Sequence, residues 1–250
     1  MEGFGDELRS WRKARRLSQM GLAAAADVSA RHIACIETGK ARPSAEMVAR
    51  LAEALALPLP ARNRLLARAG FAPRWRARDW PEAEMAPVRA AIRHMLESHA
   101  PFPGLAVDRL WRILALNGPA RALFGPLGIG EGADLLALMV SGALAPHVEN
   151  WPEVARHAAL RLRSESAAQG GAPELDHAAE RLAAEAGPGG EQAGPVIPVI
   201  LRAGGARLSL FAALAAFATP ADETLEDLRI ELYFPADPET EAALRAAAAG

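Results

Sequence analysis

Two short helical patterns joined by only three residues are the feature that most restricts how this chain can fold. The sequence predicts one helix from Ser18 to Ala26 and another from Ala30 to Glu37. Ser18 and Ser29 stand where a serine caps a helix, and Gly39 ends the second one. Helices joined by so short a turn cross steeply, as in a helix-turn-helix, whose second helix lies in the major groove of DNA.

The second predicted helix carries the residues expected to contact DNA. Ile33 and Ile36 point toward a shared core, which leaves the opposite side for DNA. Arg31 is the best candidate for reading a base because its guanidinium can bond both acceptors of guanine. Contact between Arg31 and a phosphate is an open alternative. Gln19, Lys40 and Arg42 are expected near phosphates. The complete predicted set is Gln19, Ser29, Ala30, Arg31, His32, Cys35, Lys40 and Arg42.

The helical pattern covers residues 1–72 and predicts about five short helices, none long enough to be stable alone. They must therefore share one core. Residues 1–80 contain 15 Lys and Arg against 8 Asp and Glu, whereas residues 81–250 contain 13 against 22. This basic first part favours DNA binding over helices whose arginines are merely solvated. The predicted core residues are Leu8, Trp11, Leu17, Leu22, Ile33, Ile36, Val48, Leu51, Leu55, Leu65 and Leu66.

Proline-rich residues 73–86 predict a linker between two domains, a helix-turn-helix domain at 1–72 and a second domain at 87–250. The second domain has a mixed pattern. Leu228, Ile230 and Leu232 alternate with polar residues, which predicts a strand with one buried and one wet face. Further strands are predicted over 104–108, 111–116, 196–201 and 206–218, with a tight turn at Gly204-Gly205 and a mobile loop at 187–195, and helices over 88–98, 120–124, 151–168 and 174–186.

Several segments together resemble a known family. The segments "LSQ", "VSARHIACIETGKARPS" and "MVARLAEALALP" resemble the helix-turn-helix of Xre-type regulators. The segments "PFPGLAVDRLWRILALN", "VENWPEVAR" and "FATPADETLEDLRIELYFPAD" resemble the C-terminal domain of MmyB-like regulators. The resemblance implies an all-α five-helix helix-turn-helix domain followed by an α+β PAS-like domain with an antiparallel sheet. It also implies a fatty-acid-like ligand.

One strand departs from the family pattern. Where relatives tend to have Ser and Thr, this chain has the hydroxyl-free run Phe211–Ala218. The head group of a ligand is therefore expected to be held elsewhere or left partly solvated. An apolar slot would take an acyl chain, although an ordinary core would show the same pattern. The predicted ligand contacts are Trp111, Arg112, Asn117, His147, Arg156 and Phe211.

No motif indicates catalysis, a metal site or a cofactor. The histidines lack the HExxH spacing and cysteine partners of zinc sites, and Ala133 breaks the nucleotide-loop pattern of the glycines at 125–132. An enzyme domain is therefore the weakest of three readings, behind a ligand sensor and a domain that only dimerises. The single cysteine, Cys35, fits a reducing compartment. We expect a cytoplasmic homodimer that binds duplex DNA and no membrane.

Overall fold

The computed structural model describes residues 3–186, 196–203, 205–218 and 220–249. The chain divides into two compact units. The first comprises Met1–Ala77 with Ser166–Ala172 and Ala221–Glu223, and the second comprises Arg78–Glu165, Pro173–Pro220 and Thr224–Gly250. Residues 187–195, where the sequence predicts a mobile loop, and Gly204 of the predicted turn lie outside the described residues.

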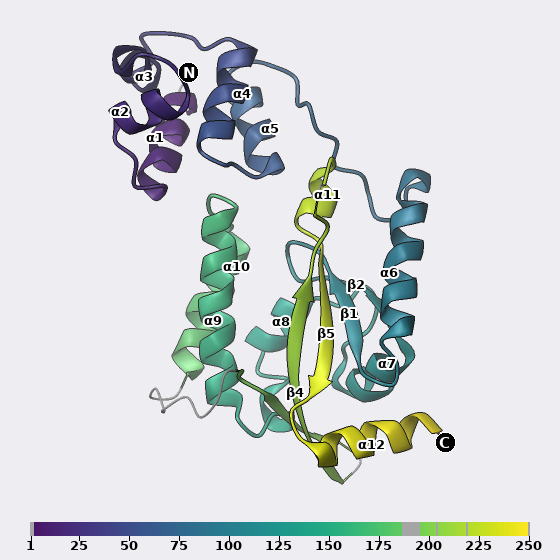
Figure 1. Cartoon of the computed structure of the whole chain (residues 1–250). Helices are drawn as coiled ribbons and strands as arrows, with labels where there is room; N and C mark the ends of the chain where they lie inside the picture. The colour runs from purple at the N-terminus through teal and green to yellow at the C-terminus, as the bar shows by residue number, and fades with distance from the viewer. Residues whose placement is uncertain (1–2, 187–195, 204, 219, 250) are drawn as a thin grey trace. The chain divides into compact units, whose positions relative to one another are not determined.

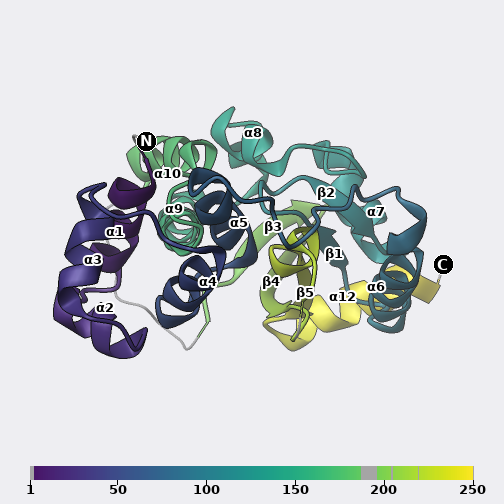
Figure 2. The ribbon, with the colours of Figure 1, turned by 90° about the horizontal axis from the view of Figure 1, so that it is seen from above.

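The N-terminal part of the first unit is helical, as predicted, and Figure 2 shows its five helices as one group. A serine begins each of three of them. The hydroxyls of Ser18, Ser29 and Ser44 accept hydrogen bonds from backbone N–H groups three residues ahead, at 2.9, 3.1 and 3.2 Å. The helices are α1 (Phe4–Ala14), α2 (Gln19–Ala25), α3 (Ala30–Glu37), α4 (Ala45–Ala54) and α5 (Leu59–Arg68).

These helices enclose one apolar core. The core contains all the residues predicted for it except Leu17, which is partly buried against it. Ala23 and Ala26 are buried at the end of α2. Their methyl side chains allow this helix to pack closely against its neighbours. Asp27, which follows, adopts the left-handed conformation with φ of 52° and turns the chain toward α3. Short helices that would be marginal alone are thus held by a common core.

The second unit is an α+β fold built on a five-stranded antiparallel sheet, as the sequence predicts. Its strands are β1 (Gly104–Val107), β2 (Ile113–Leu116), β3 (Val199–Ala203), β4 (Ala206–Ala215) and β5 (Arg229–Pro235). The helices that lie wholly or mostly in this unit are η1 (Ala83–Met85), α6 (Ala86–Ser98), α7 (Gly118–Phe124), η2 (Gly125–Leu127), α8 (Leu135–Val140), η3 (Ala145–His147), α9 (Trp151–Ala168), α10 (Pro173–Glu185), α11 (Glu223–Glu226) and α12 (Pro238–Ala249). The last residues of α9, from Ser166, and the first residue of α11, Glu223, belong to the first unit.

The strand order is β2-β1-β5-β4-β3. The last three strands along the chain form consecutive antiparallel pairs, as the hairpin pattern predicts. Strand β1 then pairs with β5, placing Leu105 opposite Glu231, which the local sequence pattern does not reveal. The sheet therefore joins an early part of the domain to a late one.

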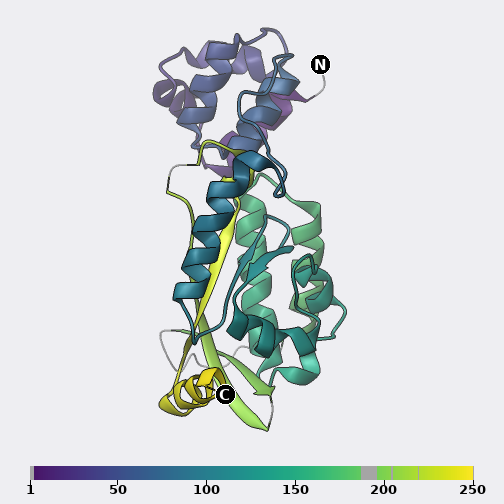
Figure 3. The same cartoon turned by 90° about the vertical axis from the view of Figure 1, so that its right-hand side faces the viewer.

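Helices cover both faces of the sheet. Helix α6 lies alongside the strands on one face (Figure 1, Figure 3), where its Ile92 and Leu96 pack with Ala106, Leu228 and Ile230. Helix α9 lies on the other side. The predicted wet face of β5 is therefore wrong at its centre, because Glu231 on that face is only 3% exposed. Among the described residues, no helix is both long and apolar enough to cross a membrane.

Candidate DNA interface and candidate ligand pocket

Helix α3 divides its residues between the core and the solvent as a DNA-reading helix must. Ile33 and Ile36 are 0% and 1% exposed, whereas Arg31 is exposed on the opposite side. Lys40 and Arg42 are exposed just beyond the helix. Of the other predicted contacts, Ser29 is exposed and caps α3, and Ala30, His32 and Cys35 are half-buried. Among the predicted contacts within α3 itself, Arg31 is the exposed one and has the longest side chain.

A buried carboxylate at the C-terminal end of α3 connects this helix to the two preceding helices. Glu37 is 3% exposed and accepts hydrogen bonds from Arg12 at 2.6 and 2.9 Å. The Gln19 amide donates to Glu37 Oε2 at 2.8 Å. Burial alone would raise the pKa of Glu37, but the hydrogen bonds from Arg12 and Gln19 outweigh it and hold that pKa below its usual value. Glu37 therefore stays a carboxylate that fixes Gln19 at the start of α2.

In the sequence pattern Glu37 marks only the end of a helix, and its contacts with Arg12 and Gln19 are not predicted. The sequence does contain a signal for this role, because Glu37 lies four residues after Ile33 and so shares its side of the helix, which faces the core. A charged residue at such a position needs a partner of opposite charge. Arg12 is that partner, but its place in the three-dimensional structure cannot be read from local spacing.

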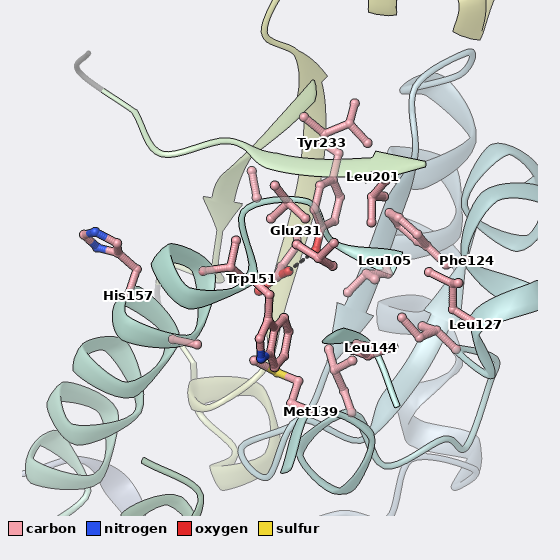
Figure 4. Close-up of a pocket in the computed structure, with 18 of the residues that line it drawn as sticks. Leu105, Phe124, Leu127, Met139, Leu144, Trp151, His157, Leu201, Glu231 and Tyr233 are labelled. Carbon is pink, nitrogen blue, oxygen red and sulfur yellow. Dashed lines mark hydrogen bonds between the residues drawn. The ribbon is translucent and has the colours of Figure 1, made fainter. Parts of the chain in front are cut away.

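The second unit contains a largely apolar cavity of about 310 Å³ between the sheet and helices α8 and α9. Figure 4 shows side chains from the sheet and from α7, α8 and α9 pointing into it, including Phe124, Met139, Trp151 and Leu201. A volume of this size falls at the lower end of the range of about 300–1,000 Å³ typical of small-molecule sites. The remaining lining residues are Leu105, Trp111, Leu127, Ile129, Leu135, Leu144, Val148, Val154, His157, Ala158, Arg161, Ile197, Val199, Leu210, Ala212, Glu231 and Tyr233.

One part of this lining is polar. Arg161 Nη1 lies 2.7 Å from Glu231 Oε1, and the Tyr233 hydroxyl donates to Glu231 Oε2 at 2.8 Å (Figure 4). Burial, followed by the charge of Glu231, raises the pKa of Tyr233 well above its usual value. Tyr233 is therefore a neutral hydrogen-bond donor beside a buried ion pair.

A second carboxylate completes the polar cluster. Glu165 accepts from Arg161 Nε at 2.9 Å and from the Trp111 indole at 2.9 Å, and it lies 3.4 Å from Arg229 Nε. The Arg161 guanidinium also lies 4.3 Å from the centroid of the Trp111 ring. We call Arg161, Arg229, Glu165, Glu231 and Tyr233 the polar cluster. It balances two arginines against two glutamates.

The structure places one of the six predicted ligand contacts in the cavity lining, namely Trp111. Asn117 is buried elsewhere, where it caps α7 and bonds the backbone of Gly104 and Leu96. Phe211 stacks on Phe234, on the other side of β4 from the lining residues Leu210 and Ala212. Arg112 and His147 are exposed, and Arg156 lies 3.9 Å from Glu153. None of these five belongs to the described lining.

Arg161, Glu231 and Tyr233 are absent from the predicted ligand contacts. The signal for Arg161 lies in helical spacing, since Trp151, Val154 and Ala158 follow one side of α9, which Arg161 and Glu165 continue at intervals of three and four. Charged residues within an apolar helix face indicate a buried partner. Among the described residues, no group of three or more His, Cys, Asp or Glu side chains is arranged to hold a metal ion.

A helix-turn-helix together with a domain that encloses an apolar cavity defines a ligand-responsive transcription regulator. Comparison with family models agrees, since a helix-turn-helix domain matches residues 4–65. The ligand binding domain of MmyB-like transcription regulators matches residues 88–247, well over half of the chain. The chain therefore belongs to the MmyB-like transcription regulators. No curated protein matches it.

Proposed function

We propose that this regulator binds the alkyl chain of a small amphiphile, such as a fatty acid, in its cavity and thereby changes its affinity for DNA. The observation that supports this most is the cavity itself, whose lining is mainly Leu, Ile, Val and aromatic side chains. Burying each methylene of a chain there is worth about 0.8 kcal/mol. A chain of increasing length should therefore bind increasingly well until the cavity is full.

The DNA-binding role of individual residues is also a proposal. Arg31 reads a base from α3, while Gln19, Lys40 and Arg42 contact phosphates around it. Glu37 takes one of the two N–H groups of the Gln19 amide, and the second remains to donate to a phosphate oxygen. Ser29, Ala30, His32 and Cys35 complete the surface that approaches the groove.

We further propose that the regulator is a homodimer and acts in the cytoplasm, where a bacterial-type regulator meets its operator. One short reading helix contacts too few bases for useful specificity, and two helices double the contact set. Ligand and DNA binding are coupled if they favour different arrangements of the two helix-turn-helix domains. Such couplings typically amount to about 1–3 kcal/mol.

The test combines two measurements on the full chain. Native mass spectrometry of the purified protein shows a retained ligand directly, and calorimetric titration with fatty acids of increasing length shows whether affinity rises with each methylene. Operator binding is then measured with and without the best ligand. Absence of binding by every chain length would leave dimerisation as the task of the second domain.

A further inference from the structure

The polar end of the cavity contains a carboxylate and a guanidinium that already form an ion pair. Arg161 and Glu231 line the cavity together, and the charges of the whole polar cluster sum to zero. Glu231 is 3% exposed, so water screens its charge poorly. A ligand that adds a negative charge at this end meets the Glu231 carboxylate. Among the described residues, the one cation that pairs with Glu231 is Arg161, which is shared with Glu165.

The cluster also contains polar atoms whose bonding capacity is not used. Arg161 Nη2 is buried and has no hydrogen-bond partner among the described residues. Glu231 Oε1 is held by the charge of Arg161 at 2.7 Å, but it accepts no aligned hydrogen bond within the described part of the chain. A buried polar atom without a partner destabilises the folded state. One donor and one acceptor therefore remain unsatisfied beside the cavity, and a ligand reaches them only when the Arg161 and Glu231 side chains shift.

We infer that this end of the cavity selects an uncharged head group that both donates and accepts a hydrogen bond, namely a long-chain alcohol or primary amide, over a carboxylate. The hydroxyl or amide accepts from Arg161 Nη2 and donates to Glu231 Oε1 after a small opening of the ion pair. A carboxylate has no proton to donate to Glu231 and brings a like charge next to it. His157, the other titratable lining residue, points away from the Glu231 and Tyr233 side chains in Figure 4 and does not offset this charge.

This inference rests on the proposed function, because it assigns the head group of a molecule whose chain fills the same cavity. The direct test needs no variant. Decanol, decanamide and decanoate share one alkyl chain and differ only at the head group. Their dissociation constants from the full protein chain are therefore compared at neutral pH by calorimetry. We expect decanol and decanamide to bind about tenfold or more tightly than decanoate, as a like charge at a buried site disfavours the charged form.

Two variants then identify the side chains responsible. Glu231→Gln removes the negative charge and leaves Arg161 available to a carboxylate, so decanoate should gain about tenfold while decanol changes little. Arg161→Gln should do the opposite, weakening decanoate further and favouring decylamine, whose cation can pair with Glu231. Glu131→Gln is the matched control, because Glu131 is exposed, pairs with Arg121 and lies outside the lining. A general disturbance of the fold would weaken all ligands alike.

The outcomes separate the two proposals. If decanoate binds wild-type protein as tightly as decanol, or if Glu231→Gln leaves their ratio unchanged, the head-group inference is wrong and chain binding stands. If none of the three compounds binds, both the inference and the proposed chain binding are overturned. Preference for decanol with its reversal in Glu231→Gln supports the inference.

Discussion

Tyr233 donates its hydroxyl to Glu231 at 2.8 Å, and both side chains lie on the same face of β5, two residues apart. Burial and then the charge of Glu231 raise the pKa of Tyr233 well above its usual value. The folded chain therefore retains this proton at a pH where the unfolded chain loses it. The contribution of Tyr233 to stability is complete below about pH 10 and is lost as the pH rises through the folded-state pKa.

The first prediction is that Tyr233 ionises only when the protein unfolds. Tyr233 is the only tyrosine of the sequence, so phenolate absorbance reports on this residue alone. During an alkaline titration, phenolate absorbance should appear together with the loss of circular dichroism rather than before it. Tyr233→Phe removes the absorbance change and serves as the control. Phenolate that forms near pH 10 in a chain with unchanged circular dichroism would show that the hydroxyl is accessible.

A second prediction concerns Glu37, the buried carboxylate at the end of α3. Glu37→Gln keeps the shape of the side chain but removes the charge that pairs with Arg12, so it should destabilise the helix-turn-helix by about 1–3 kcal/mol. Hydrogen exchange of the α1 and α3 amides in the full chain measures this locally. Glu46→Gln, an exposed change in α4, is the matched control and should leave exchange unchanged.

The same residue predicts a response to acid. The pKa of Glu37 is lower in the folded chain than in the unfolded chain, so the unfolded state binds the proton first. The stabilisation by Glu37 is therefore present above about pH 4.5 and is lost as the pH falls through the folded-state pKa. Exchange in α1 and α3 should accelerate over this range in wild-type protein and much less in Glu37→Gln. Equal acceleration in both would assign the acid response to other groups.

A third prediction separates base reading from phosphate contact. On an identified operator, Arg31→Ala should cost about 1–3 kcal/mol and relax the preference at one base position. Gln19→Ala should weaken binding evenly across sequences. The measurement is titration against a set of operator variants, with Arg121→Ala in the second unit as the control. An even loss for Arg31→Ala would make Arg31 a phosphate contact, and a position-specific loss for Gln19→Ala would contradict its assigned role.

A fourth prediction concerns assembly on DNA. The operator should be a pseudo-palindrome whose half-sites lie about 10 base pairs apart, centre to centre, because two reading helices related by a two-fold axis meet the major groove one turn apart. Footprinting shows the half-sites, and light scattering gives the mass of the free protein. A single asymmetric footprint, or a monomer at working concentration, would remove the dimer from the proposal.

A fifth prediction tests the cavity by filling it. Ala158 lies in its lining and is 8% exposed, so Ala158→Phe should occupy space that an alkyl chain needs. Long chains should lose at least about tenfold in affinity, while short chains lose less, because each excluded methylene is worth about 0.8 kcal/mol. Ala137→Phe, at an exposed position of α8 outside the lining, is the control. Unchanged affinity in Ala158→Phe would show that the alkyl chain binds outside this cavity.

The helix-turn-helix could be predicted almost completely from sequence because its signals are local. Ser18, Ser29 and Ser44 each cap a helix within three residues of their own position. The apolar spacing of Ile33 and Ile36 directly gives the face that is buried. These features depend only on neighbours along the chain, so the folded structure reproduces them.

The ligand pocket was predictable only in part, because its polar end is assembled from distant residues. The alternation along β5 correctly gives a strand, but alternation alone does not tell whether the polar face meets water or another helix. In this fold α9 covers that face, and Arg161 meets Glu231 there. Arg112 and His147 have side chains that can bind a head group, but both are exposed and lie outside the described lining.

The pairing of β1 with β5 determines when the ligand domain can form. Leu105 has no sheet partner on β5 until Glu231 is synthesised, and these residues are separated by half of the chain. Sheets that depend on such distant pairs fold slowly, whereas helical domains with local contacts fold fast. The apolar core shared by α1 to α5 comes from the first part of the chain alone, so these helices can pack early during synthesis. The ligand domain must wait for nearly the whole polypeptide, and until then its apolar strands depend on protection from aggregation.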